Sequence, residues 1–531
     1  MIHLSPLIFI VATLTGLSVI AGRIKLPYPI LLVLAGLVIG FVPGLPVIEL
    51  QPDMVFLIFL PPLLYRAAWN TSWRDFRSAI RPISRLAVGL VLFTTVAVAA
   101  AAHYYLGLGW SVAFVLGAIV SPPDAVAATS ILQNMGLDKR IVTILNGESL
   151  VNDASALIAY RYAVAAVLSS GFVLWKAGLQ FLLVSSAGIL IGLVIGYILA
   201  FILRRIKDNP MVESSLSLMT PFIAYPVAEH AGVSGVLAAV SAGLVTSWMS
   251  PKIFSYQGRN QTKAIWDMLG FLLNGIIFIL IGVQLSHIAE GLEGYKLSRL
   301  IGDGLIITVV AILVRLLFIA PVIFFPRFLA SEIRQPEQVF NWKNVLVMSW
   351  SGMRGVVSLA TAMALPQLPD GNPFPDRNII LFITFAVILF TLLGQGLTLP
   401  LLIRWLKISP SANEEEEERK LRLLVINSSL DYINDRFAGK DVEPEVLEQV
   451  KKLYLLRSGW LKNEGLPDNL PTKDLSKDSL LEKVVGVQLD VTSFKRELLL
   501  KLYREGSYSA DNIKKLEREL DFDESRLQSQ L

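Results

Sequence analysis

The sequence lacks cysteine altogether and holds only four histidines among its 531 residues. Without cysteine, the chain can form no disulfide bond, thiolate nucleophile or iron–sulfur cluster. The histidines are widely separated, so no short metal-ligand motif is present. We therefore expect neither a transition-metal centre nor a cofactor.

Charge is also scarce, at 17% of residues, whereas 54% are hydrophobic and the mean hydropathy is +0.58. Ordinary soluble domains carry roughly 25% charged residues. Apolar runs recur from Leu4 to Lys407, and as helices of about 20 residues such runs cross a hydrocarbon core of roughly 30 Å. The first run, Leu4 to Ala21, lacks a basic leader and a small-residue cleavage site, so we expect it to be retained. The sequence predicts an all-α polytopic membrane protein.

Polar breaks divide this membrane part into about thirteen predicted transmembrane helices. The predicted spans are 4–21, 28–47, 53–68, 82–106, 110–133, 139–168, 176–203, 211–230, 232–250, 262–286, 299–325, 342–366 and 378–406.

The lysines and arginines of the connecting loops follow the odd-numbered spans. Loops after even-numbered spans hold only Lys176, Lys296, Arg299 and Arg377. The positive-inside rule places the odd loops and the C-terminal tail in the cytoplasm and the N-terminus outside, with a multi-pass chain in the cell (inner) membrane. This topology explains the basic pI without nucleic-acid binding.

The composition of the chain changes from apolar to acidic after residue 410. Residues 411–531 are acidic and open with the run Glu414 to Glu418. Helix-like spacing follows at Leu421, Leu424 and Val425. The sequence predicts a transmembrane domain at 1–410 and a helical cytoplasmic C-terminal domain at 411–531. We interpret the glutamate run as a solvated helix start, with a regulatory role as the alternative.

A few charged residues interrupt the apolar spans. A charge at the bilayer centre costs about 2.5 to 3.5 kcal/mol on insertion scales, and such residues usually line ion or proton paths. These residues are Asp124, Glu148, Asp153, Arg161 and Arg354, with Arg315 less clearly placed.

Span 6 gathers four oxygen-bearing side chains. At 100° per residue, Glu148, Ser149, Asn152 and Asp153 share one helix face. Oxygen ligands suit a hard cation such as Na⁺. The alternative is a cluster that serves helix capping or packing.

Spans 5 and 12 are predicted to be broken helices. Pro122 and Pro123 precede Asp124 in span 5, and Gly352 and Gly355 flank Arg354 in span 12. Broken backbone at membrane depth commonly faces a transported ion, although a kink with a snorkelling aspartate is an alternative for span 5. Arg354 needs an anionic partner, either Glu148 or a helix C-terminus. The two broken helices, spans 5 and 12, lie seven spans apart. This spacing predicts two inverted repeats, spans 1–6 and 8–13, with span 7 as connector.

Several motifs carry a family resemblance across Leu7 to Leu406. They are Phe56 to Pro62, Gly147 to Ala154, Gly232 to Ala238, Asn274 to Phe278, and Met353-Arg354-Gly355. On these motifs the chain resembles the sodium/proton exchangers of the monovalent cation:proton antiporter superfamily, in their electroneutral branch and bacterial form.

The resemblance implies an architecture as well as an activity. It implies a homodimer working by elevator-like alternating access. Its dimerisation part is expected at about 1–70 and 211–290, its ion-translocating core at about 82–168 and 299–406, and a linker helix at about 176–203.

The resemblance also assigns roles to the site residues. Asp153 looks like the carboxylate that binds either Na⁺ or H⁺, with Ser149 as a further Na⁺ ligand, and Asn152 looks like the neutral residue of electroneutral exchange. Glu148 and Arg354 resemble a bracing ion pair. Many relatives have Asp-Pro-Val-Ala-Val in the broken helix, whereas here Asp124 follows the two prolines and lies two positions later.

The expected function is therefore transport, with no enzymatic activity. The expected reaction is exchange of Na⁺ or Li⁺ for H⁺. A K⁺/H⁺ antiporter and a cation sensor that signals through the tail are the alternatives. An intramembrane aspartyl protease is disfavoured because the Gly-x-Gly-Asp signature is missing, and a channel because no carbonyl-filter repeat is present.

Overall fold

The computed structural model describes residues 4–24, 27–42, 54–132, 135, 137, 139–168, 174–206, 209–290, 292, 296–324, 342–368, 373–408, 412–437, 443–461 and 478–528. By internal contacts the chain divides into a membrane unit, Met1–Ser409, and a tail unit, Pro410–Leu531. The span ends predicted at 43–47, 53, 133 and 325, and the predicted boundary at 410–411, lie outside the described residues.

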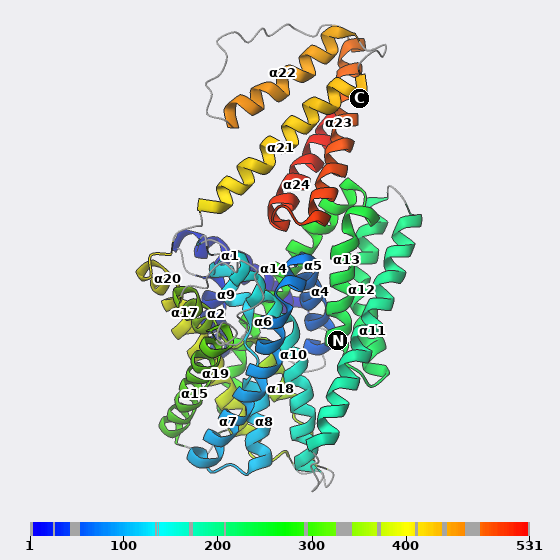
Figure 1. Ribbon diagram of the computed structural model, residues 1–531. Coiled ribbons are helices and arrows are strands. Elements are labelled where there is room, and N and C mark those ends of the chain that lie inside the picture. Colours follow the sequence, from blue (N-terminus) through cyan, green and yellow to red (C-terminus); the bar gives the residue numbers. More distant parts are fainter. Residues whose placement is uncertain are drawn as a thin grey trace. The chain divides into compact units, whose positions relative to one another are not determined.

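In the described ranges, every regular element of the membrane unit is helical (Figure 1). The first half comprises α1 (Leu4–Ile24), α2 (Tyr28–Phe41), η1 (Val55–Phe59), α4 (Leu60–Asn70), α5 (Trp73–Ser78), α6 (Ile80–Ser84), η2 (Arg85–Leu90), α7 (Val91–Leu106), α8 (Trp110–Val120), α9 (Ala125–Leu132) and α10 (Lys139–Leu168). The second half comprises α11 (Leu174–Arg205), α12 (Pro210–His230), α13 (Gly235–Ile253), α14 (Tyr256–Glu290), α15 (Leu297–Phe324), α17 (Trp342–Trp350), α18 (Val356–Met363), α19 (Arg377–Phe390), η3 (Thr391–Gln395) and α20 (Gly396–Trp405).

Six helical stretches among the described residues are long and apolar enough to cross a membrane. They are Ile80–Leu106, Gly178–Arg205, Gly235–Ile253, Tyr256–Leu285, Leu297–Pro321 and Arg377–Trp405. Shorter or more polar helices occupy the other predicted spans. The prediction of an all-α polytopic membrane protein is confirmed; the count of thirteen crossings and the inverted repeat stay predictions.

Both predicted helix breaks are confirmed. One helix ends at Val120 and the next begins at Ala125, and the second break separates Trp350 from Val356. The prolines at the first break supply no N–H donor, so the helical hydrogen-bond ladder cannot pass through them. The breaks lie far apart in sequence, but they meet in the fold.

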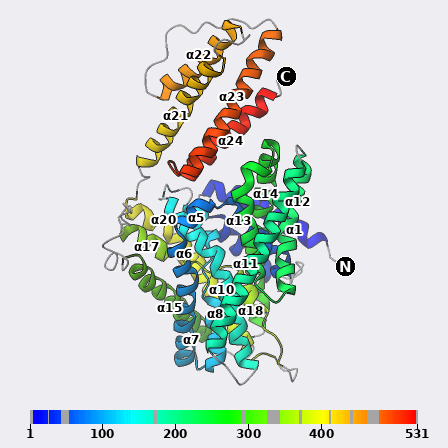
Figure 2. The same ribbon diagram turned by 45° about the vertical axis from the view of Figure 1, so that its right-hand side comes forward.

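Small residues let the helices of the second half approach closely. Helices α11, α12 and α13 pack against one another (Figures 1 and 2). A Cβ atom built on Gly188 of α11 would lie 2.6 Å from the carbonyl oxygen of Ser234, and one on Gly192 would strike the carbonyl of Ala238. Glycine is therefore required on this face of α11, as is common where membrane helices pack.

The tail unit is also helical in its described part, with α21 (Ala412–Phe437), α22 (Pro444–Leu461), α23 (Asp478–Glu505) and α24 (Ala510–Gln528). Leu421 of α21, Leu499 of α23 and Ile513 of α24 share one apolar cluster. Tyr454 of α22 and Val491 of α23 belong to a second. These clusters join the four helices into a small bundle.

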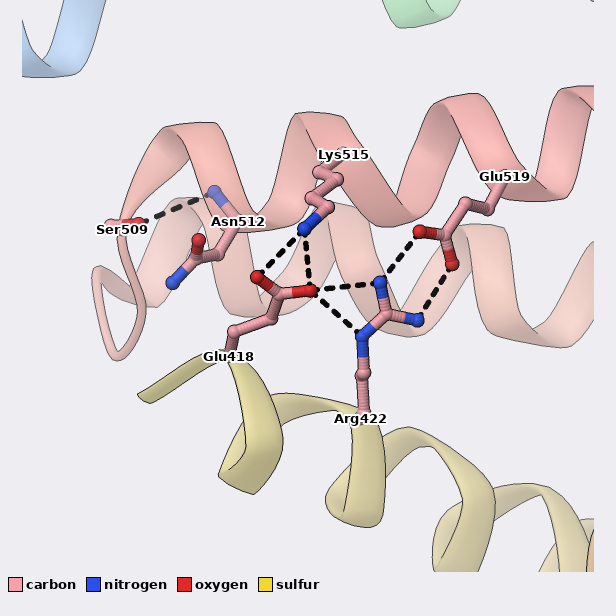
Figure 3. Close-up of polar contacts among 6 residues, drawn as sticks. All are labelled: Glu418, Arg422, Ser509, Asn512, Lys515 and Glu519. Carbon is pink, nitrogen blue, oxygen red and sulfur yellow. Dashed lines mark hydrogen bonds and ion pairs between the residues drawn. The ribbon is translucent and has the colours of Figure 1, made fainter. Parts of the chain in front are cut away.

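A polar network ties α21 to α24 beside the first cluster (Figure 3). Arg422 donates to both carboxylate oxygens of Glu519, at 2.6 and 2.7 Å, and to Glu418 at 2.9 Å. Lys515 donates to Glu418 at 2.8 Å. Partial burial acts to raise the pKa of Glu418, but the hydrogen bonds and charges of Lys515 and Arg422 outweigh it and lower that pKa below its ordinary value. Glu418, the last of the five glutamates, is thus a contact residue between helices.

We expect Arg422→Met to lower the free energy of unfolding of the tail unit by about 1 kcal/mol, because the pairs are partly exposed and solvent weakens each of them. Thermal unfolding of residues 410–531, followed by circular dichroism at neutral pH, measures the loss. Because the pKa of Glu418 is lowered by folding, its contribution exists above the unfolded-state pKa and disappears as the pH falls through the folded-state value. The difference between the two proteins should therefore shrink in acid.

Arg419→Met is the matched control. Arg419 lies on the same helix, but among the described residues its ion pair is with Glu416 alone, at 3.7 Å, and both side chains are 47% exposed. A loss as large in the Arg419 variant as in the Arg422 variant would contradict the assignment.

Candidate functional site

The two broken helices cross at their extended segments. The amide nitrogen of Asp124 donates to the carbonyl oxygen of Met353 at 2.7 Å. The first segment is buried from Ser121 to Pro123 and the second throughout, from Ser351 to Gly355. A Cβ atom at Gly355 would collide with the Asp124 carboxylate, so the glycine permits the close approach.

Helix α10 contacts this crossing through Asn152. The side chain of Asn152 is fully buried, and its Nδ2 donates to the carbonyl oxygen of Pro123 at 2.7 Å. Pro123 lies between the two halves of the broken helix, and the amide of Asn152 serves as a donor to its carbonyl. Asn152 therefore fixes α10 against the first broken helix.

Asp153 lies beside this contact and is 7% exposed. No hydrogen bond or ion pair to Asp153 occurs among the described residues. The charge of Asp124 acts on it, so the two carboxylates are close enough to repel each other. A buried carboxylate without a compensating partner is costly, so a proton or a cation would stabilise it.

Asp124 is engaged differently. Its Oδ1 accepts a hydrogen bond at 2.8 Å from the amide of Val126, in the first turn of α9. The side chain thus caps the second half of the broken helix. Its role as an ion ligand stays a prediction.

Ser149 lies one helical turn before Asp153 and is half-buried. A spacing of four residues places both side chains on the same face of α10. Ser149 already makes a polar contact in the structure. Its role as a Na⁺ ligand stays a prediction.

The buried ion pair differs from the prediction. The partner of Glu148 is Arg315 of α15: Nη2 of Arg315 donates to Oε2 of Glu148 at 3.0 Å, and Nη1 donates to Oε1. The two residues are 2% and 1% exposed. Nε of Arg315 also donates to the carbonyl of Met348, at 3.3 Å. The predicted Glu148–Arg354 ion pair is not formed among the described residues: Arg315 makes both hydrogen bonds to the Glu148 carboxylate, and the charge of Glu148 acts on Arg354 from beyond ion-pair distance.

Arg354 is equally buried but lacks an ion-pair partner among the described residues. Its backbone nitrogen donates to Oγ1 of Thr391 at 3.0 Å, whereas its side-chain Nε and Nη1 have no hydrogen-bond partner there. The side-chain oxygen and nitrogen of Gln395, one turn after Thr391, are also buried and unpaired. Gln395 ends a π-helical turn, a feature frequent at functional sites.

Thr391 and Gln395 are not among the site residues predicted from the sequence. Both are polar residues within the apolar run 378–406, which was a usable signal. Uncharged polar residues in membrane helices often only bond their own backbone, so the signal was weak.

Few charged side chains lie near the crossing of the broken helices. The described residues include no cluster of three or more histidine, cysteine, aspartate or glutamate side chains that could hold a metal ion. The charge of Glu148 is compensated by Arg315, whereas that of Asp153 is not. Asp153 is therefore a buried carboxylate whose charge no basic side chain among the described residues compensates.

Comparisons with known proteins show what this chain is similar to. The model of a family described as "Sodium/hydrogen exchanger, transmembrane" matches residues 9–405. An uncharacterized Na⁺/H⁺ exchanger of Mycobacterium tuberculosis is 32% identical over 98% of this chain and 95% of its own. A sodium, potassium, lithium and rubidium/H⁺ antiporter of Bacillus pumilus is 31% identical over 71% of this chain and 58% of its own.

The fold also matches a solved structure. The sodium proton antiporter MjNhaP1 of Methanocaldococcus jannaschii aligns with a TM-score of 0.58 at 20% identity, over 75% of this chain and 98% of the archaeal one. At this identity the match concerns the fold.

We expect Arg315→Met to destabilise the membrane unit by about 3 to 5 kcal/mol, because it leaves Glu148 buried without a partner. Combining it with Glu148→Gln should recover a large part of the loss. Thermal unfolding of the detergent-solubilised protein measures the coupling between the two changes. The same cycle between Arg354→Met and Glu148→Gln should give a smaller coupling energy. A larger coupling energy for Arg354 than for Arg315 would support Arg354 as the partner of Glu148.

Proposed function

The chain belongs to the transmembrane sodium/hydrogen exchanger family, and on that premise we propose that it exchanges Na⁺ for H⁺ across the cytoplasmic membrane. Li⁺ is a further substrate in this proposal. The observation that carries it is the uncompensated carboxylate of Asp153, buried beside the crossing of two broken helices.

Exchange follows from competition for that carboxylate. Burial penalises the bare charge, so Asp153 crosses the membrane neutralised either by a proton or by a cation. Ser149, one turn away, supplies a neutral oxygen to the dehydrated cation. Asp124 is close enough to Asp153 to add its negative charge to the electrostatic field at the cation. The empty, charged form is disfavoured, which couples the two fluxes.

One exchangeable charge supports an electroneutral cycle. Asn152 is neutral, and Glu148 is held by Arg315. One Na⁺ or one H⁺ then moves on one carboxylate, and the translocated complex has the same net charge in both half-cycles.

The proposal includes the elevator-like mechanism of a homodimer. The ion-translocating core, residues 82–168 and 299–406, carries Asp153 and both broken helices. The dimerisation part, residues 1–70 and 211–290, serves as the static scaffold, and the helix at 176–203 links the two. The N-terminus lies outside and the tail in the cytoplasm, as the loop cations indicate.

K⁺/H⁺ exchange is the second candidate. The Bacillus pumilus relative is named for sodium, potassium, lithium and rubidium. The same carboxylate chemistry would serve K⁺, with the choice set by cavity size and ligand geometry.

We expect Asp153→Asn to abolish cation-dependent proton movement. Proteoliposomes with an internal pH-sensitive dye and an imposed pH gradient receive Na⁺, Li⁺ or K⁺. Wild-type protein should dissipate the gradient without a charge shunt, and its rate should not respond to an imposed membrane potential. Asp267→Asn makes the same chemical change at a 49%-exposed site and should retain exchange. A K⁺-only response would select the second candidate, and full activity in Asp153→Asn would exclude the assigned carboxylate.

We expect a chain ending at Ser409 to keep exchange activity within about threefold of the full-length rate. The family model matches residues 9–405 and includes none of the tail, so we expect the exchange machinery to lie within the membrane unit. The same dye assay measures both proteins. Loss of exchange with retained cation binding would instead favour a sensor that acts through the tail.

A further inference from the structure

Arg161 is a charged residue in the interior of span 6 to which the transport site gives no role. It lies on α10 two helical turns after Asp153, and its side chain is 52% exposed. Its Nη2 donates to Oε2 of Glu229, on α12, at 2.7 Å. This ion pair joins α10 to α12 through two residues that lie 68 positions apart in sequence.

The position of Glu229 is fixed by the corner between α12 and α13. Its other oxygen, Oε1, accepts a hydrogen bond at 3.1 Å from the amide of Gly235, the first residue of α13. A Cβ atom on Gly235 would lie 2.9 Å from both Cγ of Glu229 and the carbonyl oxygen of Tyr225. The carboxylate is therefore anchored to the α12–α13 corner, and Arg161 reaches it from α10.

The two helices belong to parts with different proposed roles. Helix α10 carries Asp153 and lies in the proposed core, whereas α12 and α13 lie in the proposed dimerisation part; both α10 and α12 are labelled in Figure 2. This step rests on the proposed elevator mechanism. A second pair, Arg66 of α4 with Asp267 of α14 at 3.2 Å, lies wholly inside the dimerisation part.

We infer that Arg161 and Glu229 position the core against the dimerisation part in one state of the transport cycle, and that their ion pair opens for the other state. When one bundle moves against the other, a pair at 2.7 Å across the boundary separates, whereas a pair within one bundle persists. The two residues are positioning residues, because they touch neither the cation nor the proton.

The ion pair favours one state of the transport cycle but still allows the protein to reach the other. Both side chains are partly exposed, so their attraction changes the ratio of the two states by about fivefold at most. A bias of this size still permits turnover. Arg161→Gln should therefore change the maximal exchange rate by about two- to fivefold, and Arg161→Lys, which keeps the charge, should change it less.

A covalent link replaces the ion pair in the decisive experiment. Because the natural chain lacks cysteine, the pair Arg161→Cys and Glu229→Cys is the sole target for a short, reducible, bifunctional thiol reagent. The full-length protein is reconstituted, and Na⁺-driven proton movement is measured before cross-linking, after cross-linking and after reduction. We expect cross-linking to stop exchange and reduction to restore it.

The matched control is the pair Arg66→Cys and Asp267→Cys, which should cross-link without loss of exchange. If the wild type is active and the cross-linked Arg161→Cys/Glu229→Cys protein continues to exchange, this inference is overturned and the proposed function still stands. A wild type that exchanges no cation overturns the proposed function and this inference with it. Equal arrest in the control pair would show that any link stops transport, and would overturn the special role of Arg161 and Glu229.

Discussion

The membrane unit depends on how its few buried charges are compensated. Glu148 and Arg315 are almost fully buried, and either alone would be strongly destabilising in an apolar interior. Their two hydrogen bonds join α10 to α15, and Arg315 also reaches the carbonyl of Met348 at the end of α17. One ion pair thus holds the helix of Asp153 against the second broken helix.

The broken helices supply the rest of the site through their backbone. A break frees peptide groups that must find partners inside the protein. The amide of Asp124 donates a hydrogen bond to the carbonyl of Met353, and the amide of Arg354 donates to the hydroxyl of Thr391. The carbonyl of Pro123 accepts a hydrogen bond from the side chain of Asn152. These bonds are satisfied between elements, so the crossing is rigid around Asp153 while that carboxylate itself remains without a partner among the described residues.

Much of this arrangement was predictable from local patterns. Long apolar runs indicate membrane helices wherever they occur, and two prolines in mid-span break a helix in any context. The common face of Glu148, Asn152 and Asp153 follows from helical geometry alone. The partner of Glu148 was not predictable in this way: both Arg315 and Arg354 lie in apolar spans, and nothing local distinguishes them.

The sequence by itself therefore determined the all-α membrane fold, the two breaks and the face of α10 that carries the carboxylates, because each depends on neighbours within a few residues. Only the tertiary structure decided which buried arginine neutralises Glu148, that Asp124 caps α9, and that Arg161 meets Glu229. The Glu148–Arg315 pair spans 167 residues of chain, so its formation depends on how whole helices pack. A contact between residues so far apart in the chain depends on the packing of the helices, and no periodic pattern in the sequence indicates it.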